Sequence, residues 1–408
     1  MRARWLCLAA LAFAPAAAGC GGVGISAGAS TLGNQLTIYS SLPLQGPSGE
    51  NSQQIVAGEK LALAEAGGHV GSLKIAYASL DDSNSKTGQW DPGVTAANAK
   101  TAAQDSSTVA YLGDYNSAAS AVSLPLINSA GILQVSPASP YVGLTSSLDA
   151  GQDEPNRFYP TGRRTFGRIM AGDRVQAGAQ IQLMREQNVK RVYVLSDQSP
   201  FEAPLAGIVG GDAHAAGIEV TGQGSVDTIA GADFSGEIGK ITDSDSDAVF
   251  FSGGTTPGTV KLWQQLHQAD PKLLLLGSNT MVSDAFTAQI GTAGARTLLT
   301  TPVLAPGLYP AAAQRLFSDY RAHFGGHPGP YALYGYEAMS VVLQAIRDAG
   351  PHGNERQTVI DRFFAIRNRD SVLGRYSIQP NGDTSLSSYG VDRVVNGRPV
   401  FWRALNVR

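Results

Sequence analysis

The chain has 408 residues, a formal net charge of −3 and 15% charged residues. This balance provides no basic surface for nucleic acid and no electrostatic attraction to a membrane. Its only cysteines are Cys7 and Cys20, so the rest of the chain can form neither a disulfide framework nor a cysteine-built metal site or nucleophile.

The first 20 residues have the pattern of a secretory signal. Arg2 and Arg4 precede an apolar stretch, too short to span a bilayer stably, and Ala17-Ala-Gly-Cys20 follows. Small residues directly before Cys20 resemble a bacterial lipoprotein signal, in which the cysteine carries the lipid. We expect a signal peptide at 1–19, a lipidated Cys20 with a flexible Gly/Ala/Ser-rich tether at 20–33, and an extracytoplasmic protein anchored to the bacterial cell membrane. An ordinary cleaved signal with an incidental cysteine is the alternative.

Strands and helices alternate from Asn34 onward, in two successive sets that residues 155–160 separate. The periodicity of apolar residues predicts strands at 36–39, 73–77, 109–112, 132–135, 191–195, 218–220, 248–251, 272–276 and 297–303. It predicts helices at 50–66, 94–103, 117–128, 166–187, 204–216, 234–241, 258–268, 311–323 and 331–349. Strands that alternate with helices imply βαβ units, so we expect an α/β fold of two doubly wound parallel-sheet lobes.

Two such lobes imply one shared ligand site. Ligands of open α/β sheets bind outside the carboxyl ends of the strands, so the facing loops of two lobes surround a common cleft. The loops that follow the expected strands are at 42–51, 113–117, 136–141, 197–202, 252–257 and 277–280.

The sequence offers no convincing catalytic or metal-binding constellation. Gly24-Ile-Ser-Ala-Gly28 matches a hydrolase nucleophile motif but lies in the tether, without the strand and helix that such a motif needs. Asp243-Ser-Asp-Ser-Asp247 resembles a calcium loop, yet Ala248 stands where the loop turn requires glycine. The six histidines are scattered along the chain. We therefore expect no enzyme, no metal and no cofactor.

Two loop residues indicate a binding site instead. Ser117 stands where a helix begins just after a strand, so its hydroxyl and the free N–H groups of the first turn can hold a carboxylate. The alternative, which is compatible, is that Ser117 only caps this helix. Phe201 follows a strand of the second lobe and can stack on a ligand; ordinary packing is its alternative.

Motifs in a fixed order support a family resemblance. Ser41-Leu-Pro-Leu-Gln-Gly-Pro47 opens the first lobe, and Gly58 lies in a helix that ends at Gly67-Gly68. Leu80-Asp-Asp82, Tyr111-Leu-Gly113, Gly131-Ile-Leu-Gln-Val-Ser-Pro137, Leu144-Thr145, Gly253-Gly254, Gly277 and Tyr334-Gly-Tyr-Glu-Ala338 follow in order. This series resembles the leucine/isoleucine/valine-binding proteins of ABC transporters, over essentially the whole mature chain.

The resemblance implies a type I periplasmic binding fold, with two lobes, three hinge crossings and closure around a small ligand like a Venus flytrap. Carried over to this chain, the first lobe comprises 34–160 plus 303–373, and the second 161–302 plus 374–408. The resemblance further implies a small-molecule ligand, an ABC transporter permease as partner, and a monomer.

The resemblance also assigns ligand-binding roles. Ser117 matches the serine that holds the ligand carboxylate, Ser139 a position that offers its backbone, and Phe201 an aromatic residue of the second lobe. Asn51 and Thr255 stand where the family often has aromatic residues. Pro140 replaces a carboxylate-binding threonine, and it lacks both a hydroxyl and an N–H.

Asn279 stands where an acidic residue of the family pairs with the ligand ammonium. We therefore expect a small, polar, carboxylate-bearing ligand that is not a standard branched-chain amino acid, unless another acid such as Glu202 or Asp284 replaces the missing one. A substrate-binding lipoprotein of an ABC transporter is the leading prediction. A sensory or regulatory lipoprotein that uses the same fold is the alternative.

Overall fold

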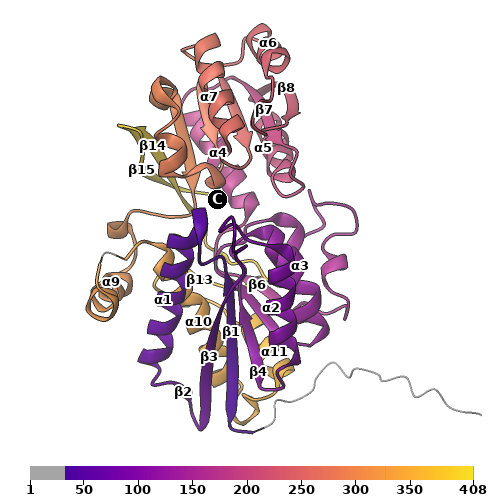
Figure 1. The fold of residues 1–408 in the computed structure, drawn as a ribbon, viewed down its shortest axis with the longest axis vertical. Coiled ribbons are helices and arrows are strands. Elements are labelled where there is room, and N and C mark those ends of the chain that lie inside the picture. The colour runs from indigo at the N-terminus through magenta and orange to yellow at the C-terminus, as the bar shows by residue number, and fades with distance from the viewer. Residues whose placement is uncertain (1–32, 327, 408) are drawn as a thin grey trace, which may run out of the picture.

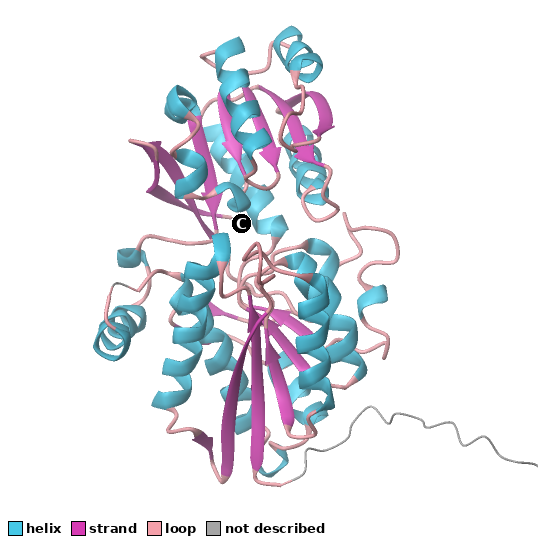
Figure 2. Ribbon diagram, viewed as in Figure 1, coloured by secondary structure: helices cyan, strands magenta, loops and turns pink. Residues whose placement is uncertain are grey.

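The computed structural model of the chain describes residues 33–326 and 328–407. The expected signal peptide, Cys20 and nearly all of the tether lie outside the described residues. Two lobes, each built around one sheet, are arranged end to end (Figure 1). Helices cover both faces of each sheet (Figure 2). The α/β fold with two parallel-sheet lobes is therefore confirmed.

The first sheet has six strands in the order β2-β3-β1-β4-β5-β6, and only β2 runs antiparallel to its neighbour. Its strands are β1 (Gln35–Leu42), β2 (His69–Val70), β3 (Leu73–Asp81), β4 (Thr108–Leu112), β5 (Leu133–Ser136) and β6 (Phe166–Arg168). Its helices are α1 (Gly49–Glu65), α2 (Pro92–Gln104), α3 (Ser117–Ser129), α9 (Ala311–Phe324), α10 (Tyr331–Asp348) and α11 (Arg356–Phe364).

The second sheet has seven strands in the order β15-β14-β11-β10-β9-β7-β8. Its strands are β7 (Arg191–Asp197), β8 (Glu219–Val226), β9 (Ala248–Ser252), β10 (Leu274–Gly277), β11 (Thr297–Thr301), β14 (Ser388–Val395) and β15 (Arg398–Asn406). Its helices are α4 (Asp173–Glu186), α5 (Ala203–Ala215), α6 (Ser235–Asp243), α7 (Pro257–Ala269) and α8 (Asp284–Thr287). The C-terminal hairpin β14–β15 thus joins this sheet as antiparallel strands next to β11.

Alternating residues of one strand pack on opposite faces of the second sheet. Phe250 belongs to the core beneath α4 and α5, whereas Val249 and Phe251 belong to the core on the other face with Trp263 of α7. A strand that is buried on both faces has a continuous run of apolar residues in its sequence, as residues 248–251 have.

Two glycines allow α1 and α10 to cross at close range in the first lobe. A Cβ on Gly58 would overlap the backbone carbonyl of Ala332, and a Cβ on Gly335 would overlap that of Ile55. Because the glycines face each other's helix, the two backbones approach more closely than any larger residue permits.

The structure corrects one expected helix and shifts two expected boundaries. Residues 166–168 form β6, paired with β5, and α4 begins only at Asp173, so a helix at 166–187 was wrong at its start. The first sheet therefore extends beyond residue 160. Tyr376 and Ile378 pack in the core of the first lobe, so this lobe also continues past residue 373. The remaining lobe boundaries stay a prediction.

Within residues 33–326 and 328–407, no helix combines the length and the apolar character that crossing a membrane requires. The same residues contain no group of three or more His, Cys, Asp or Glu side chains placed to hold a metal ion.

Candidate ligand-binding site

The loops that follow the strands of the two sheets face each other between the lobes (Figure 1). Tyr141, after β5, and Phe201, after β7, make an edge-to-face contact with ring centroids 5.2 Å apart and planes at 78°. The backbone N–H of Tyr141 donates to Ser117 Oγ at 3.3 Å. Tyr141 thus contacts two predicted ligand residues, Ser117 through its backbone N–H and Phe201 through its ring.

Ser117 is the first residue of α3 and does not cap it. Asn116 occupies the N-cap position, and its side chain makes no capping hydrogen bond. Ser117 Oγ accepts from Tyr141, so its hydroxyl proton is still available to a ligand. The N–H groups of the first helical turn have no partner within the helix, and the helix dipole favours an anion there. This end of α3 is suited to a carboxylate.

Ser139 is fully buried and already hydrogen-bonded within the first lobe. Its N–H donates to Ser136 Oγ at 2.9 Å, and its carbonyl accepts from Arg168 at 2.8 Å. Its hydroxyl donates to the Asp114 carbonyl at 3.0 Å. A role for the Ser139 backbone in ligand binding stays a prediction. A ligand would have to share the N–H and carbonyl groups of Ser139 with the hydrogen bonds that they already make.

Asp114 organises the loop between β4 and α3. Its buried carboxyl accepts from Ser123 at 2.5 Å and from Tyr111 at 3.2 Å, and its backbone N–H donates to Ser120 Oγ. Burial and the nearby charge of Asp82 raise the pKa of Asp114 to about 8. This network fixes the start of α3, and with it Ser117.

Arg168, at the end of β6, fixes the loop that carries Tyr141. Its buried guanidinium donates to the carbonyls of Ser139 and Tyr141 and to the hydroxyl of Thr145. It also forms an ion pair with Asp383 at 2.8 Å. Sequence reasoning missed this residue because it placed Arg168 in a helix.

The second lobe contributes the loops after β7, β9 and β10. Ser252, at the end of β9, donates to the Glu202 carboxylate at 2.7 Å, and Thr280 donates to the Gly253 carbonyl at 2.9 Å. Asn279 opens the short 3-10 helix Asn279–Met281 and is partly buried, whereas Thr255 is exposed. Burial raises the pKa of Glu202 to about 7. The hydrogen bond from Ser252 acts against this rise, and the charge of Asp197 adds to it.

Asp173 joins the second lobe to the loop of the first. Its carboxylate accepts from the Val142 N–H at 3.1 Å, and its own N–H donates to the Pro140 carbonyl at 3.0 Å. Burial and the charge of Glu202 raise the pKa of Asp173 to about 8, against the lowering effect of Arg168. The carbonyl of Pro140 is therefore used to position α4.

Asn51 lies in the first turn of α1 beside an aromatic pair that sequence reasoning missed. Its side-chain amide donates to the Tyr115 hydroxyl at 3.1 Å, and the Tyr115 ring lies 5.8 Å from that of Tyr331. Tyr115 falls in a loop that the sequence singled out, but no sequence signal places Tyr331 next to it. These rings give the first lobe an apolar wall next to Asn51.

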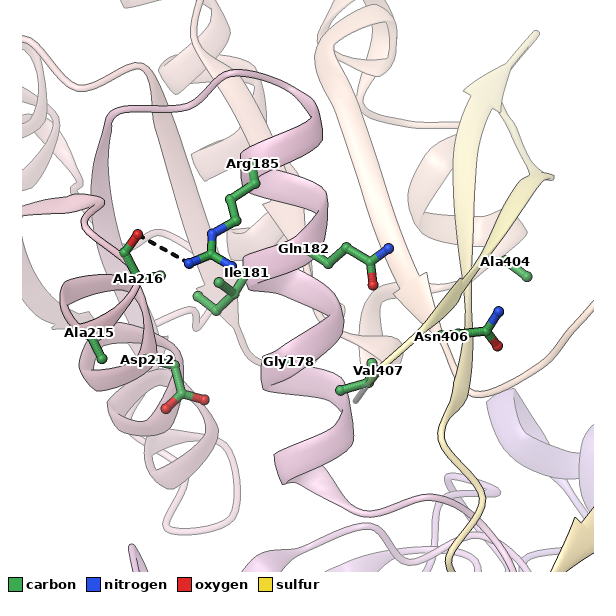
Figure 3. Close-up of a pocket in the computed structure, with 10 residues that line it drawn as sticks. All are labelled: Gly178, Ile181, Gln182, Arg185, Asp212, Ala215, Ala216, Ala404, Asn406 and Val407. Carbon is green, nitrogen blue, oxygen red and sulfur yellow. Dashed lines mark hydrogen bonds between the residues drawn. The ribbon is translucent and has the colours of Figure 1, made fainter.

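A separate hollow of about 770 Å³ lies on the second lobe between α4, α5 and β15 (Figure 3). Arg185, its most prominent charged side chain, donates to the Ala216 carbonyl at 3.3 Å. Ile181, Ala215 and Val407 give it an apolar lining. This hollow lies against helix flanks rather than at the carboxyl ends of strands, so the facing loops are the better candidate site.

The two sheets and their facing loops define a two-lobed α/β binding protein. The family model described as a periplasmic binding protein matches residues 36–395. The chain belongs to this family. The resemblance to leucine/isoleucine/valine-binding proteins is likewise confirmed.

Known relatives cover nearly the whole chain. Leu/Ile/Val-binding protein homolog 1 of Brucella abortus (strain 2308) is 26% identical over 353 residues, 85% of this chain and 87% of that protein. A leucine-binding protein of Thermotoga maritima has a similar structure, with a TM-score of 0.74 at 22% identity, covering 91% of this chain and 99% of that one. A solute-binding protein of an ABC transporter from Rhodopseudomonas palustris BisB5, solved with 3,4-dihydroxybenzoic acid, has a TM-score of 0.68 at 17% identity, covering 92% and 98%.

Proposed function

We propose that the mature chain is the extracytoplasmic substrate-binding lipoprotein of an ABC transporter. It captures a small, carboxylate-bearing ligand between its lobes and presents the closed form to a membrane permease. The contact between Tyr141 and Phe201 carries this proposal, because it places the Ser117 end of α3 opposite the loops of the second lobe. The family of the chain and the names of its relatives support it.

In this mechanism each lobe holds one side of the ligand. Ser117 Oγ and the N–H groups of the first turn of α3 bind the carboxylate. Phe201 and Asn279 then close over the ligand from the second lobe. Closure excludes water, which strengthens the hydrogen bonds inside the site, and it creates a shape that a permease can distinguish from the open form. No bond-making step is required.

A thermal-shift panel tests the proposal. Protein that starts at Gly21 is mixed with branched-chain amino acids, other amino acids, small carboxylates, amides and aromatic acids. A ligand at a hundred times its dissociation constant adds about 2.7 kcal/mol to the free energy of unfolding, which raises the melting temperature visibly. We expect at least one carboxylate to do so. An unchanged melting temperature with every compound of the panel would contradict the proposal and favour a sensory or regulatory protein that binds a macromolecular partner.

A further inference from the structure

We propose that a hollow in the first lobe, away from the facing loops, binds a phosphate-bearing anion. The hollow has a volume of about 430 Å³ and lies between α11, the residues just before β6 and the loop that carries Pro380. Three arginines line it, Arg163, Arg164 and Arg367. The site is separate from the facing loops and does not depend on the function proposed above.

The hollow lies at the end of the first sheet opposite to the facing loops. Arg163 and Arg164 shortly precede β6, and Arg168 at the other end of this strand belongs to the candidate ligand site. Asn128, near the end of α3, donates to the Arg163 carbonyl at 2.8 Å. Asn128 comes eleven positions after Ser117 in α3, which is about 16 Å along the helix axis. An anion in the hollow is therefore distinct from the carboxylate proposed at Ser117.

Neutral groups hold the three guanidinium groups in place. Arg163 donates to the side-chain oxygen of Gln357 at 3.0 Å. Arg367 donates to three backbone carbonyls, each at 2.8 Å. The guanidinium of Arg164 lies over the Tyr159 ring, 4.4 Å from its centroid. These contacts orient the cations without supplying a negative charge to them.

The charge of the three arginines is not balanced by carboxylates. Within residues 33–326 and 328–407, none of the three forms an ion pair. Among the lining residues only Asp361 is acidic, and it is exposed and accepts from Gln357 at 2.8 Å. Asp383, in the loop that carries Pro380, is engaged by Arg168 at 2.8 Å. Three arginines against one aspartate leave a local positive excess, which the net charge of −3 for the whole chain does not reveal.

A phosphate group matches this set of donors. Each guanidinium presents N–H groups in a planar fork that fits two phosphate oxygens, and several such forks can share one phosphate. Ile360 and Phe364 of α11, which packs against β4 and β5, give the hollow an apolar wall (Figure 1). The wall can contact the organic part of a phosphate ester.

The place of the hollow favours a lipid headgroup as the source of the phosphate. β1, β4, β5 and β6 run parallel, so β1 begins at the same end of the sheet as the hollow. β1 is also the strand closest along the chain to Cys20, the residue that carries the lipid in the proposed lipoprotein. An anionic phospholipid is therefore the expected source, and a soluble phosphate compound is the alternative.

Two probes test this inference on protein that starts at Gly21, which has no lipid anchor of its own. Inorganic phosphate is titrated by isothermal titration calorimetry. Vesicles of phosphatidylglycerol and phosphatidylcholine are sedimented with the protein, and pure phosphatidylcholine vesicles are the neutral reference. We expect wild type to bind phosphate, the anionic vesicles or both, and to bind more weakly as the salt concentration rises, because the contact is electrostatic.

Matched variants link the binding to the hollow. Arg163→Gln with Arg164→Gln should weaken binding at least about tenfold. Arg393→Gln with Arg398→Gln, both exposed in the β14–β15 hairpin, changes the net charge equally and should keep binding within about twofold of wild type. Asp361→Asn removes the acid of the hollow and should strengthen binding about twofold. Misfolding cannot produce such a gain.

The outcomes decide between the two sources and test the hollow itself. Arginine-dependent binding of vesicles identifies a lipid headgroup, and arginine-dependent binding of phosphate alone identifies a soluble compound; both support the inference if the double variant still unfolds cooperatively. Equal binding by the two double variants, or no binding of either probe by wild type, would overturn it. The affinity for the carboxylate found in the thermal-shift panel should not change in Arg163→Gln with Arg164→Gln, so failure here leaves the proposed function standing.

Discussion

Tyr141 of the first lobe and Phe201 of the second form an edge-to-face pair, with ring centroids 5.2 Å apart. The hydroxyl of Tyr141 also donates to Glu154 at 2.5 Å, which holds the ring from the side of the first lobe. The pair therefore links a rigidly held ring to a loop that belongs to the other lobe. Such a link couples the angle between the lobes to the geometry of the site.

The aromatic pair should contribute a measurable coupling energy. In a double-mutant cycle of ligand affinity with Phe201→Ala and Tyr141→Ala, we expect about 0.5–1.5 kcal/mol of interaction between the rings. Phe201→Leu, which retains apolar bulk without the ring, should recover only part of the loss. Additive effects of the two alanine changes would show that the rings do not act together.

Ser117→Ala should weaken ligand binding without lowering stability. The hydroxyl supplies one hydrogen bond to the carboxylate, so we expect a loss of about 1.5–3 kcal/mol in binding free energy, as for bonds to charged groups. Calorimetry measures the affinity. Ser129→Ala at the other end of α3, where the hydroxyl only donates to the Pro125 carbonyl, is the control. Unchanged affinity in Ser117→Ala would remove Ser117 from the site.

Gly335→Ala should destabilise the first lobe. The added methyl group would overlap the Ile55 carbonyl of α1, and relief of this clash requires the helices to separate, at a cost of about 1–3 kcal/mol. Gly207→Ala in α5 is the matched control, because a Cβ there has no neighbour within 4 Å. It should be neutral or stabilise by up to about 1 kcal/mol. Urea denaturation compares the two; equal effects would contradict the close crossing.

Stability should fall as pH rises from about 5 to 8. Burial raises the pKa to about 8 in Glu59, Asp114 and Asp173, and to about 7 in Asp82 and Glu202. In the unfolded chain these groups ionise near pH 4. Between the two values the folded state binds more protons, so each rise in pH favours unfolding, by up to about 1.4 kcal/mol per unit and group.

Urea denaturation at several pH values measures this slope. Asp114→Asn removes one buried ionisation and should reduce the slope while it keeps an acceptor for Ser123. Above about pH 8 the slope should flatten, because both states are then ionised. A free energy of unfolding that stays constant or increases from pH 5 to 8 would contradict the raised pKa values of these carboxyls.

The repeating strand–helix pattern was sufficient to predict two parallel-sheet lobes, since apolar periodicity and chain order determine βαβ units. It failed at residues 166–172, because Phe166-Gly-Arg168 is too short to show a strand period. The burial of Arg168 depends on acceptors from residues 139–145 and on Asp383, and local sequence contains no sign of such distant partners.

The site was predictable only in outline. Ser117 and Phe201 were proposed because each follows a strand, which is a local signal, and their ligand-binding roles stay predictions. The sequence left open whether Glu202 or Asp284 replaces the acid missing at Asn279. The exposure of Asp284 and the hydrogen bond from Ser252 to Glu202 depend on how the loops meet in the fold, which the local sequence does not show. Tyr331 was missed for the same reason.

We propose that the lobes close on the ligand, and a distance measured between them reports this closure. Protein that starts at Gly21 contains no cysteine, so Lys100→Cys on α2 and Asp243→Cys on α6, both exposed, accept one spin label each. Pulsed electron paramagnetic resonance then gives the distance distribution with and without the carboxylate that stabilises the protein most. We expect a shorter and narrower distribution in the ligand-bound protein. An unchanged distribution at saturating ligand would contradict capture by hinge closure.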